Sequence, residues 1–344
     1  MNGRDRITAA LSGKPVDRPP IWFMRQAGRY LPEYQAVRAQ HTFEETATSP
    51  ELATKVTVQP VHRFDLDAAI IFSDILVPLT GMGREASFPG EGGPRIDRPV
   101  NTPADVKELS IGDPWKATPY VPETIRLTRQ ALPDKAVFGF AGAPFTLASY
   151  LIEGGHNSKS SFAKTKSFAY QHPGAFRDLL HVCAETAARH LKAQIEAGAD
   201  AVQLFDTWAE ILGPREYQEL VLPSIQHVFK ALSRERVPRI YFARGTPHLL
   251  PYFPETGATA FSLDWRVSIA SARELLGQAT PLQGNLDPTI LFAPPDRVAR
   301  ETRAVLEDGA GGPHVFNLGH GILPGTPIPS VEAMVRTVQT WKGA

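Results

Sequence analysis

The feature that most constrains the fold is the regular alternation of short apolar runs with longer helical patterns along the whole chain. Apolar runs of this length, bounded by turn signals, are typical of strands buried on both faces. Strands that alternate with helices predict a parallel sheet, and eight such units predict a single (β/α)8 barrel of the TIM type. The eight runs are residues 20–24, 68–72, 136–140, 201–205, 239–242, 258–263, 281–284 and 314–318.

Helix signals lie between the runs. Ser49-Pro50-Glu51 combines an N-cap serine, a proline at the first helical position and an acid in the first turn. Pro144 and Pro214 start further helices by the same rule. A long helical region is expected over residues 160–197, ending before Gly198, and a closing helix over residues 331–341.

The remaining segments bear on domain organisation. Residues 81–100 are rich in glycine and proline, which predicts a long loop or a hairpin over one end of the barrel. A doubly wound open sheet is the alternative fold, but no G-x-G-x-x-G fingerprint follows any of the runs. Because no linker or short-period repeat divides the chain, we expect residues 1–344 to form one barrel domain.

Composition excludes several classes of function. Lys and Arg number 36, as do Asp and Glu, so the formal net charge is zero and no global field attracts nucleic acid or an anionic membrane. The single cysteine, Cys183, excludes an intrachain disulfide and a metal site built from several cysteines. Residues 1–17 carry charges throughout, and no stretch approaches the length of a membrane span. We therefore expect a cytoplasmic protein without a membrane or nucleic-acid partner.

Two arginines follow the first apolar run, within the segment IWFMRQAGRYLPEY that spans residues 21–34. Arg25 and Arg29 are four residues apart, and Gly28 between them gives the loop backbone freedom. Each planar guanidinium can hold a carboxylate through two parallel hydrogen bonds. Solvated surface arginines are the alternative interpretation. The preceding strand and the nearby Trp22 and Tyr30 favour a binding site for anions.

Other candidate residues lie where a barrel places its catalytic groups, just past the carboxyl ends of the strands. Asp74 follows a fully apolar run, so its carboxylate would lie over a dry barrel mouth; a helix cap or loop aspartate is the alternative. Thr207 offers a hydroxyl or a cap, and His320 lies between two glycines or serves only as a turn residue. Further polar residues at such ends are Arg244 and Asp264.

Three more residues, Tyr150, His181 and Cys183, have side chains that could take part in chemistry. Tyr150 lies near the end of the helix that starts at Pro144, where a half-buried core aromatic is the simplest interpretation. His181 and Cys183 form a His-x-Cys pair, which begins the zinc site of some cobalamin-linked methyltransferases on the same barrel. Such sites need a further distant cysteine, which this chain lacks, so we interpret the pair as structural.

The motifs at these positions resemble the uroporphyrinogen decarboxylase family over nearly the whole chain, in its order and at its spacing. One departure is Ala209-Glu210 after QLFDTW, where family members often have small glycine-rich residues, so the shape of that loop is in question. The matching motifs are RQAGRYLPEY (25–34), FSDIL (72–76), GFAGAPFTL (139–147), Tyr150 with EGG (153–155), QLFDTW (203–208), DWR (264–266), QGNLDP (283–288) and FNLGHGI (316–322).

The resemblance implies a specific activity. The family converts the four acetate arms of uroporphyrinogen, a cyclic tetrapyrrole with eight carboxylates, to methyl groups with release of CO₂. It uses no metal or organic cofactor, because a protonated pyrrole acts as the electron sink, and its members form homodimers. Asp74 and Arg25 match the family's catalytic positions. Its substrate-binding positions fall on Arg25, Gln26, Ala27, Gly28, Arg29, Asp74, Tyr150, Thr207 and His320.

Two rival functions remain open at this point. A corrinoid methyltransferase on the same barrel would need zinc ligands, which a zinc assay would reveal. A tetrapyrrole carrier would need the arginines but not Asp74, and it would bind porphyrinogen without releasing CO₂.

Overall fold

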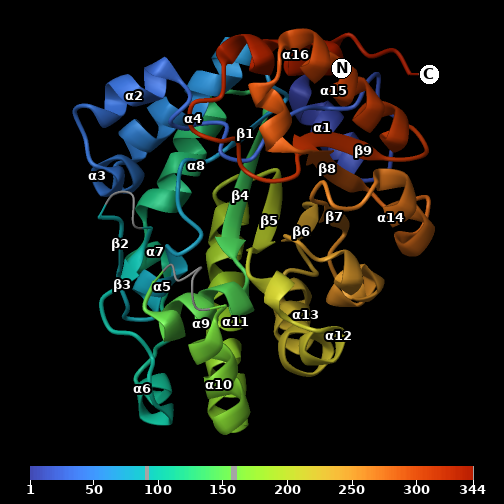
Figure 1. Cartoon of the computed structure of the whole chain (residues 1–344). Helices are drawn as coiled ribbons and strands as arrows, with labels where there is room; N and C mark the ends of the chain where they lie inside the picture. Colours follow the sequence, from blue (N-terminus) through green and yellow to red (C-terminus); the bar gives the residue numbers. More distant parts are fainter. Residues whose placement is uncertain (90–92, 156–160, 344) are drawn as a thin grey trace.

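A curled parallel sheet forms the centre of the protein (Figure 1). The computed structural model of the chain describes residues 1–89, 93–155 and 161–343. Within these ranges seven parallel strands pair in chain order, each beside the next, as the alternation of strands and helices predicts. The strands are β1 (Ala68–Ile70), β4 (Ala136–Gly142), β5 (Ala201–Asp206), β6 (Arg239–Ala243), β7 (Ala260–Ser262), β8 (Leu282–Leu286) and β9 (His314–Leu318).

Residues 20–24 take the eighth position, between β9 and β1, but not as the regular strand that we expected. Phe316 of β9 donates its backbone N–H to Pro20 (2.8 Å), and Ile21 accepts from the backbone N–H of Asp67 (3.0 Å). The amide of Ile21 bonds the Asp67 carboxylate (2.8 Å) rather than a backbone carbonyl. Because Pro19 and Pro20 have no N–H and a side chain replaces one ladder partner, only a single bridge forms here. The segment nonetheless closes the (β/α)8 ring.

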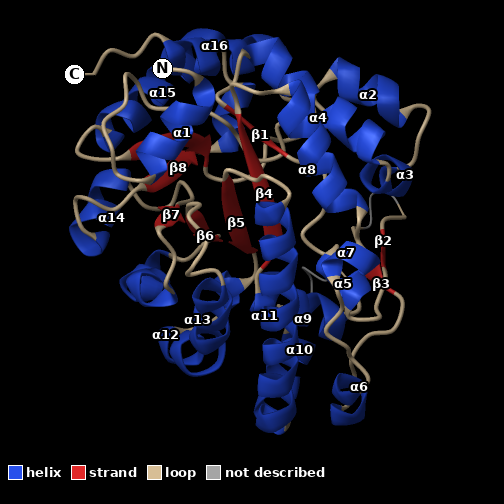
Figure 2. Ribbon diagram, turned by 180° about the vertical axis from the view of Figure 1, so that it is seen from behind, coloured by secondary structure: helices blue, strands red, loops and turns tan. Residues whose placement is uncertain are grey.

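Helices cover the outside of the sheet, and the long α11 packs along β4 and β5 (Figure 2). The α-helices are α1 (Gly3–Leu11), α2 (Pro32–Arg38), α3 (Phe43–Thr48), α4 (Pro50–Phe64), α5 (Pro78–Gly81), α6 (Pro103–Lys107), α7 (Pro114–Ala117), α8 (Tyr120–Ala131), α9 (Pro144–Glu153), α10 (Ala163–Gln171), α11 (Pro173–Glu196), α12 (Pro214–Glu216), α13 (Leu222–Ala231), α14 (Ile269–Leu276), α15 (Pro295–Gly309) and α16 (Ile328–Gln339). Shorter helical turns are η1 (Ala209–Ile211), η2 (Tyr217–Val221), η3 (Pro247–Thr256) and η4 (Pro288–Phe292).

The predicted helix starts are confirmed at Pro50, Pro144 and Pro214, and Ser49 accepts a hydrogen bond from the amide of Leu52 (3.3 Å) as N-cap. The helical region expected over residues 160–197 is confirmed over most of its length, as the two helices α10 and α11. Residue 160 lies outside the described residues, and the region divides at Pro173. A proline cannot continue a helix that would need its N–H, so α10 ends and α11 begins there.

The predicted excursion over residues 81–100 is a small antiparallel hairpin in its described part. Its strands are β2 (Ala86–Ser87) and β3 (Arg95–Ile96), and residues 90–92 between them lie outside the described ranges. Arg95 forms a further bridge with Gly155 after α9. The hairpin thereby lies beside the carboxyl-terminal end of α9.

The interior of the barrel contains one polar layer among its apolar side chains. The Trp22 indole donates to Gln283 (3.0 Å), whose amide group donates to Gln203 (2.9 Å) and to Ser262 (3.0 Å). All four side chains are fully buried and come from four different positions of the ring. Buried polar groups need such partners, so this layer fixes how the strands face one another.

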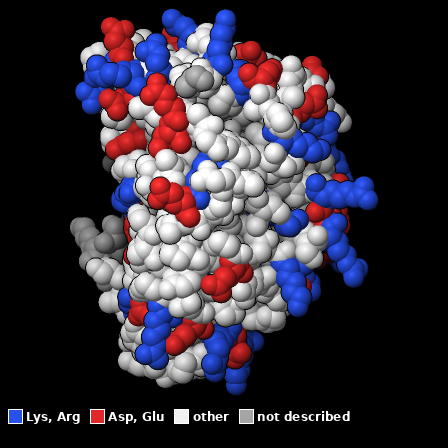
Figure 3. Space-filling view, turned by 90° about the vertical axis from the view of Figure 1, so that its right-hand side faces the viewer, with Lys and Arg blue, Asp and Glu red and all other residues white. Residues whose placement is uncertain are grey.

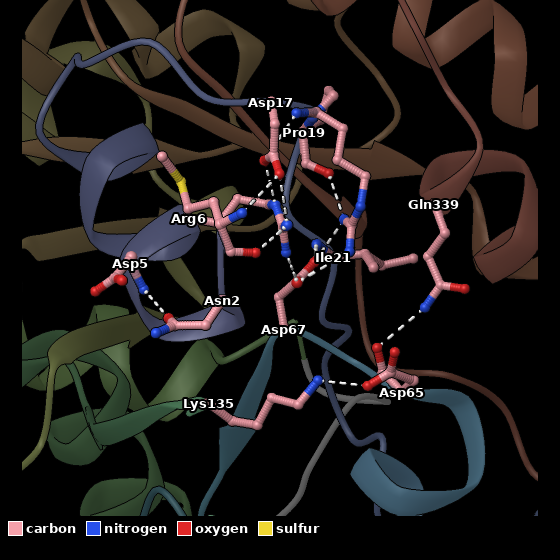
Figure 4. A network of polar contacts seen from close by, with 12 residues as sticks. Asn2, Asp5, Arg6, Asp17, Pro19, Ile21, Asp65, Asp67, Lys135 and Gln339 are labelled. Atoms are coloured by element: carbon pink, nitrogen blue, oxygen red, sulfur yellow. Dashed lines mark hydrogen bonds and ion pairs between the residues drawn. The ribbon is translucent and has the colours of Figure 1, made fainter. Parts of the chain in front are cut away.

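The amino ends of the strands are closed by α1 and a network of charges (Figure 4). The buried Asp67 accepts hydrogen bonds from Arg6 (2.5 Å), from Arg18 (2.7 and 3.0 Å) and from the Ile21 amide. Arg6 also holds Asp17 through two bonds of 2.6 and 2.8 Å. At this end of the barrel the arginines are matched by carboxylates.

The outer surface mixes charges of both signs. On the face shown in Figure 3, acidic and basic side chains lie among one another and do not form a broad patch of one sign, which agrees with the zero net charge of the sequence. Of the helices in the described ranges, none combines the length and the apolarity that crossing a bilayer requires.

Candidate active site

A cavity of about 430 Å³ opens at the carboxyl ends of the strands. Its walls come from the loop after residues 20–24, the loops after β1 and β9, the hairpin, helix α9 and the ends of β4, β5 and β6. The nine expected site residues all line it. They are Arg25, Gln26, Ala27, Gly28, Arg29, Asp74, Tyr150, Thr207 and His320.

Arg25 and Arg29 both reach this cavity with exposed side chains. Neither makes an ion pair with an acidic residue in the part of the chain that the structure describes. Arg25 has a backbone φ of 61°, a left-handed conformation that costs a non-glycine residue free energy and persists mainly at functional sites. Its side chain passes so close to Gly321 that a Cβ there would collide with it. The backbone is therefore bent to aim this guanidinium at the cavity.

The role expected of Gly28 was different from the one observed. Its φ is not in the left-handed region, so conformational freedom is not what the position requires. A Cβ on Gly28 would lie 2.8 Å from the carbonyl oxygen of Arg25, closer than real Cβ atoms come. Glycine is needed here because the tight turn between the two arginines leaves no room for a side chain.

Gln26 lines the cavity mainly through its backbone, because its side chain is fully buried and engaged. The side-chain amide donates to the carbonyl of Ala68 in β1 (3.1 Å) and accepts from the amide of Phe23 (3.3 Å). Tyr30 donates its hydroxyl hydrogen to the Gln26 carbonyl (2.9 Å). These bonds hold the loop of the two arginines against the edge of the sheet.

Asp74 lies in the loop after β1 and turns one carboxylate oxygen to the amide of Leu76 (2.8 Å). The other oxygen has no hydrogen-bond partner among the described residues, so the turn contact leaves one acceptor oxygen of Asp74 available. Burial raises the pKa of Asp74 to about 6, although the Leu76 amide and the charge of Arg25 act in the opposite direction. The carboxylate is thus poorly hydrated, and it is open to a ligand with N–H groups.

Tyr150 and His320 face the cavity as neutral groups. Burial raises the pKa of Tyr150 to about 12, with the charge of Asp74 adding to the shift. Burial lowers the pKa of His320 to about 3, and the nearby Arg25 and Arg244 lower it further. The imidazole therefore stays uncharged at neutral pH and can donate or accept one hydrogen bond from each nitrogen.

Thr207 follows β5 and lines the cavity without a side-chain hydrogen bond in the described structure. The alternative cap role is absent, since Trp208, not Thr207, precedes the helical turn η1. The flanking Asp206 is buried and bonded to Thr146 (2.8 Å) and Tyr241 (2.9 Å), which fixes the end of the strand. The Thr207 hydroxyl is consequently presented to the cavity by a rigid support.

Aromatic side chains line much of the cavity, and the sequence analysis did not predict this. The rings of Phe43 and Phe72 lie 5.4 Å apart and those of Phe43 and Phe88 4.6 Å apart, on one side of the cavity. The ring of Phe205 lies 5.7 Å from that of Phe140 and 5.7 Å from that of Phe242, at the strand ends. Phe72, Phe140 and Phe205 occur within the motifs already quoted. Because each belongs to a continuous apolar run, the sequence pattern did not distinguish these cavity residues from residues of the core.

Two candidates at strand ends lie on the rim rather than in the cavity wall. Arg244 pairs with Glu210 (2.6 Å), and Asp264 pairs with Arg266 (2.7 Å) and accepts from the amide of Gly245 (2.5 Å). Glu210 and the preceding Ala209 are the two residues at which the loop departs from the family motif, and both belong to the short turn η1.

The His181 and Cys183 pair does not form a metal site. Both residues lie on α11, where His181 faces solvent and Cys183 is fully buried, so the two side chains point in different directions. No cluster of three or more metal-binding side chains occurs among the residues described. Cys183 thus belongs to the buried face of α11 and His181 to its exposed face.

Solved structures with a similar fold include a methyltransferase from Methanosarcina mazei, with a TM-score of 0.84 and 23% identity over 98% of both chains. A B12-independent methionine synthase from Shewanella sp. W3-18-1 has a TM-score of 0.57 and 10% identity, covering 94% of this chain and 93% of its own. At these identities the likeness concerns the fold alone, and it supports the barrel.

Sequence relatives are much closer. Uroporphyrinogen decarboxylase of Geobacter sulfurreducens is 44% identical over 97% of this chain and 98% of its own length. That of Thioalkalivibrio sulfidiphilus is 46% identical over 97% of each chain. The family model described as uroporphyrinogen decarboxylase (URO-D) matches residues 2–341. This chain therefore belongs to the uroporphyrinogen decarboxylase family.

Proposed function

We propose that the protein is a uroporphyrinogen decarboxylase, a carboxy-lyase of haem and related tetrapyrrole biosynthesis. It removes CO₂ from the four acetate side chains of uroporphyrinogen and yields coproporphyrinogen. The full-length relationship to decarboxylases of this name supports the assignment. The observation that carries it is the combination of one open carboxylate, Asp74, with two arginines that have no acidic partner in the described structure, around an aromatic-lined cavity.

Each part of this combination fits one part of the substrate. The arginine forks of Arg25 and Arg29 match side-chain carboxylates. The free oxygen of Asp74 accepts N–H bonds from the pyrrole rings and so centres the macrocycle. Aromatic side chains such as Phe72 and Phe205 cover its apolar carbon skeleton, which leaves Tyr150, Thr207 and His320 for further polar contacts.

The reaction replaces each CO₂ with one proton. Protonation of the pyrrole carbon next to the one that bears the acetate arm places positive charge on the ring, in conjugation with the arm. The bond to the carboxylate then breaks, its electron pair flows into the cationic ring and CO₂ leaves. A proton added to the arm and a proton lost from the ring carbon complete the methyl group. Asp74 lies where a fixed negative charge stabilises the cation as it forms, and Arg25 orients the reacting carboxylate.

No cofactor enters this proposal, because the protonated pyrrole receives the electron pair that another decarboxylase would pass to a bound group. Turnover by protein dialysed against a chelator should equal that of untreated protein. Restoration of lost activity by zinc or another metal would contradict a cofactor-free reaction.

The direct test is anaerobic incubation of the protein with reduced uroporphyrinogen, followed by oxidation and chromatography of the porphyrins. We expect porphyrins with seven, six, five and finally four carboxylates to appear in turn. Binding of uroporphyrinogen with no loss of carboxylates would instead identify a carrier.

We further propose that residues 1–344 form one domain that works as a homodimer in the cytoplasm. The support for the dimer and the compartment is the relationship to the family, in which we expect paired clefts. Light scattering at micromolar concentration should give twice the chain mass of 37.7 kDa. A mass equal to one chain would exclude the dimer, and recovery of the protein with the membrane fraction would exclude the compartment.

A further inference from the structure

The rim of the cavity holds a third arginine, Arg244, whose setting differs from that of Arg25 and Arg29. It follows β6, directly after Ala243, and its side chain is 28% exposed. The loop after residues 20–24 and the loop after β6 stand at the first and fifth of the eight positions in the ring. Opposite positions of a barrel face each other across its mouth. Arg244 thus faces the loop of the first two arginines.

The guanidinium of Arg244 is held by one edge only. Its Nη2 donates to Glu210 Oε1 (2.6 Å) and its Nε donates to Glu210 Oε2 (3.4 Å). The planar group also lies over the ring of Trp208, with 5.9 Å from Cζ to the ring centroid. The Nη1 nitrogen has no hydrogen-bond acceptor among the described residues. The second edge, formed by Nη1 and Nη2, therefore retains N–H groups that can bind a carboxylate.

Glu210 is itself firmly placed. Gly245, the residue after Arg244, has a φ of 69°, and a Cβ on it would collide with the Glu210 carboxylate. The amide of the same glycine is bound by Asp264 from the next loop. Contacts therefore join three successive loops at this rim, and Glu210 holds one edge of the Arg244 guanidinium.

The charge of Arg244 also acts on side chains that line the cavity. It lowers the pKa of both His320 and Tyr150, two residues that line the cavity from β9 and α9. A substrate with carboxylates around its whole perimeter needs cations on more than one side. Arg25 and Arg29 lie on one side, and Arg244 supplies a cation on the other.

We propose that Arg244 binds a side-chain carboxylate of the tetrapyrrole on the side of the cavity opposite Arg25 and Arg29, and that Glu210 is the positioning residue that presents it. This inference rests on the proposed function for the identity of the ligand. It assigns a role to one of the two residues at which this loop departs from the family motif.

The first test compares binding without turnover. Uroporphyrin, the oxidised octacarboxylate, is titrated into wild-type protein, Arg244→Gln and Arg126→Gln while its fluorescence is followed. Arg126 is a matched control, since it pairs with Glu123 (3.1 Å) and lies over the ring of Trp115 (5.1 Å) on the outer helix α8. We expect about tenfold weaker binding for Arg244→Gln, the effect of one lost charge-assisted contact, and no change for Arg126→Gln.

Variants of Glu210 and Arg244 distinguish two roles for Arg244: binding the ligand, or only linking two loops through its ion pair. Glu210→Gln keeps one acceptor oxygen for Arg244 but loses the second hydrogen bond and the ion pair, so affinity should fall less than in Arg244→Gln, which removes the cation itself. Arg244→Lys keeps an ion pair with Glu210 but loses the second edge, so its affinity should fall. Equal weakening by Glu210→Gln and Arg244→Gln would overturn the proposal, because the ion pair itself would then be what matters. The proposal would also be overturned if Arg244→Gln bound uroporphyrin with wild-type affinity and had the same thermal melting curve as the wild type.

Kinetics with uroporphyrinogen give an independent readout. A contact that is equally strong in the ground and transition states affects KM and leaves kcat unchanged. We expect Arg244→Gln to raise KM about tenfold with kcat within about twofold of wild type. A fall in kcat with unchanged KM would contradict a binding role. If wild-type protein forms no product, the proposed function fails, whereas the uroporphyrin titration still decides the role of Arg244.

Discussion

The two ends of the barrel both place arginines beside an aspartate, and they use them in opposite ways. At the amino end Arg6 and Arg18 converge on the buried Asp67, so the charges are matched (Figure 4). At the carboxyl end Arg25 and Arg29 have no acidic ion-pair partner in the described structure, and the nearby Asp74 keeps one oxygen open. Matched charges stabilise the fold, while unmatched charges are available to a ligand.

The aspartates of the two ends also titrate in opposite directions. Hydrogen bonds from Arg6 hold the pKa of Asp17 well below its usual range, whereas burial raises the pKa of Asp74 to about 6 from an ordinary 3.8. Asp17 therefore adds stability above the pKa of the unfolded chain, which is lost as the pH falls. Between pH 3.8 and 6 the folded protein holds a proton on Asp74 that the unfolded chain has released, so ionising Asp74 lowers stability as the pH rises. Of these two aspartates, Asp74 is the one whose negative charge lowers the stability of the fold.

The largest expected effect comes from breaking the matched end. Asp67→Asn removes the carboxylate that two arginines share while they stay largely buried, which should lower the free energy of unfolding by about 3–5 kcal/mol. Denaturant melts measure it. The control is Asp65→Asn, since Asp65 pairs with Lys135 but is 82% exposed; its loss should stay within about 0.5 kcal/mol. Equal melts for the two variants would show that the network is not structural.

Removing the open carboxylate should instead affect chemistry. Asp74→Asn keeps the shape and an acceptor oxygen but removes the charge that stabilises the cationic ring. Turnover should fall by about a hundredfold or more, with folding and much of the binding intact. Asp74→Glu should also be impaired, since the added methylene pushes the carboxylate into the ring. Coproporphyrinogen formed per site is measured beside a thermal melt, and near wild-type turnover by the asparagine variant would exclude Asp74 as the central group.

Arg29→Lys tests whether the unmatched arginines bind by their shape or only by their charge. A lysine is a point donor and cannot reproduce the fork, so one charge-assisted contact is lost. Affinity for coproporphyrinogen should fall about ten- to a hundredfold, equivalent to roughly 1.5–3 kcal/mol. Unchanged affinity in an equilibrium titration would show that Arg29 is a surface residue.

The smallest effect is the pH dependence of the free enzyme. If the ionised form of Asp74 is the active one, kcat/KM should rise about tenfold per pH unit in acid and level off above about pH 6. Asp74→Asn should lack this limb while the rest of its profile follows the wild type. If kcat/KM of the asparagine variant still rose with pH in acid, a group other than Asp74 would be responsible for that rise.

The sequence alone determined the architecture because its signals are local. Apolar runs, proline at helix starts and the Ser49 cap depend on neighbours along the chain, and they predicted the barrel and most helices. The rule that strands of a parallel barrel end on one face predicted Arg25, Arg29, Asp74, Thr207 and His320 as site residues. The resemblance to the family, not this rule, added Gln26, Ala27, Gly28 and Tyr150. The break at Pro173 was a local signal that the long periodic pattern obscured, and the loss of regular pairing at Ile21 depended on the distant Asp67.

Only the tertiary structure decided which charges are matched. Arg18 and Arg25 flank the same apolar run, and the nearby sequence does not show which of them meets a buried carboxylate. Arg18 meets Asp67, 49 positions away, whereas Arg25 is turned by a left-handed backbone toward an open cavity. Glu210 and Arg244 likewise meet across 34 positions. An ion pair forms only when its two charged groups lie within a few ångströms of each other. The number of residues between the two partners along the chain does not determine that distance in space.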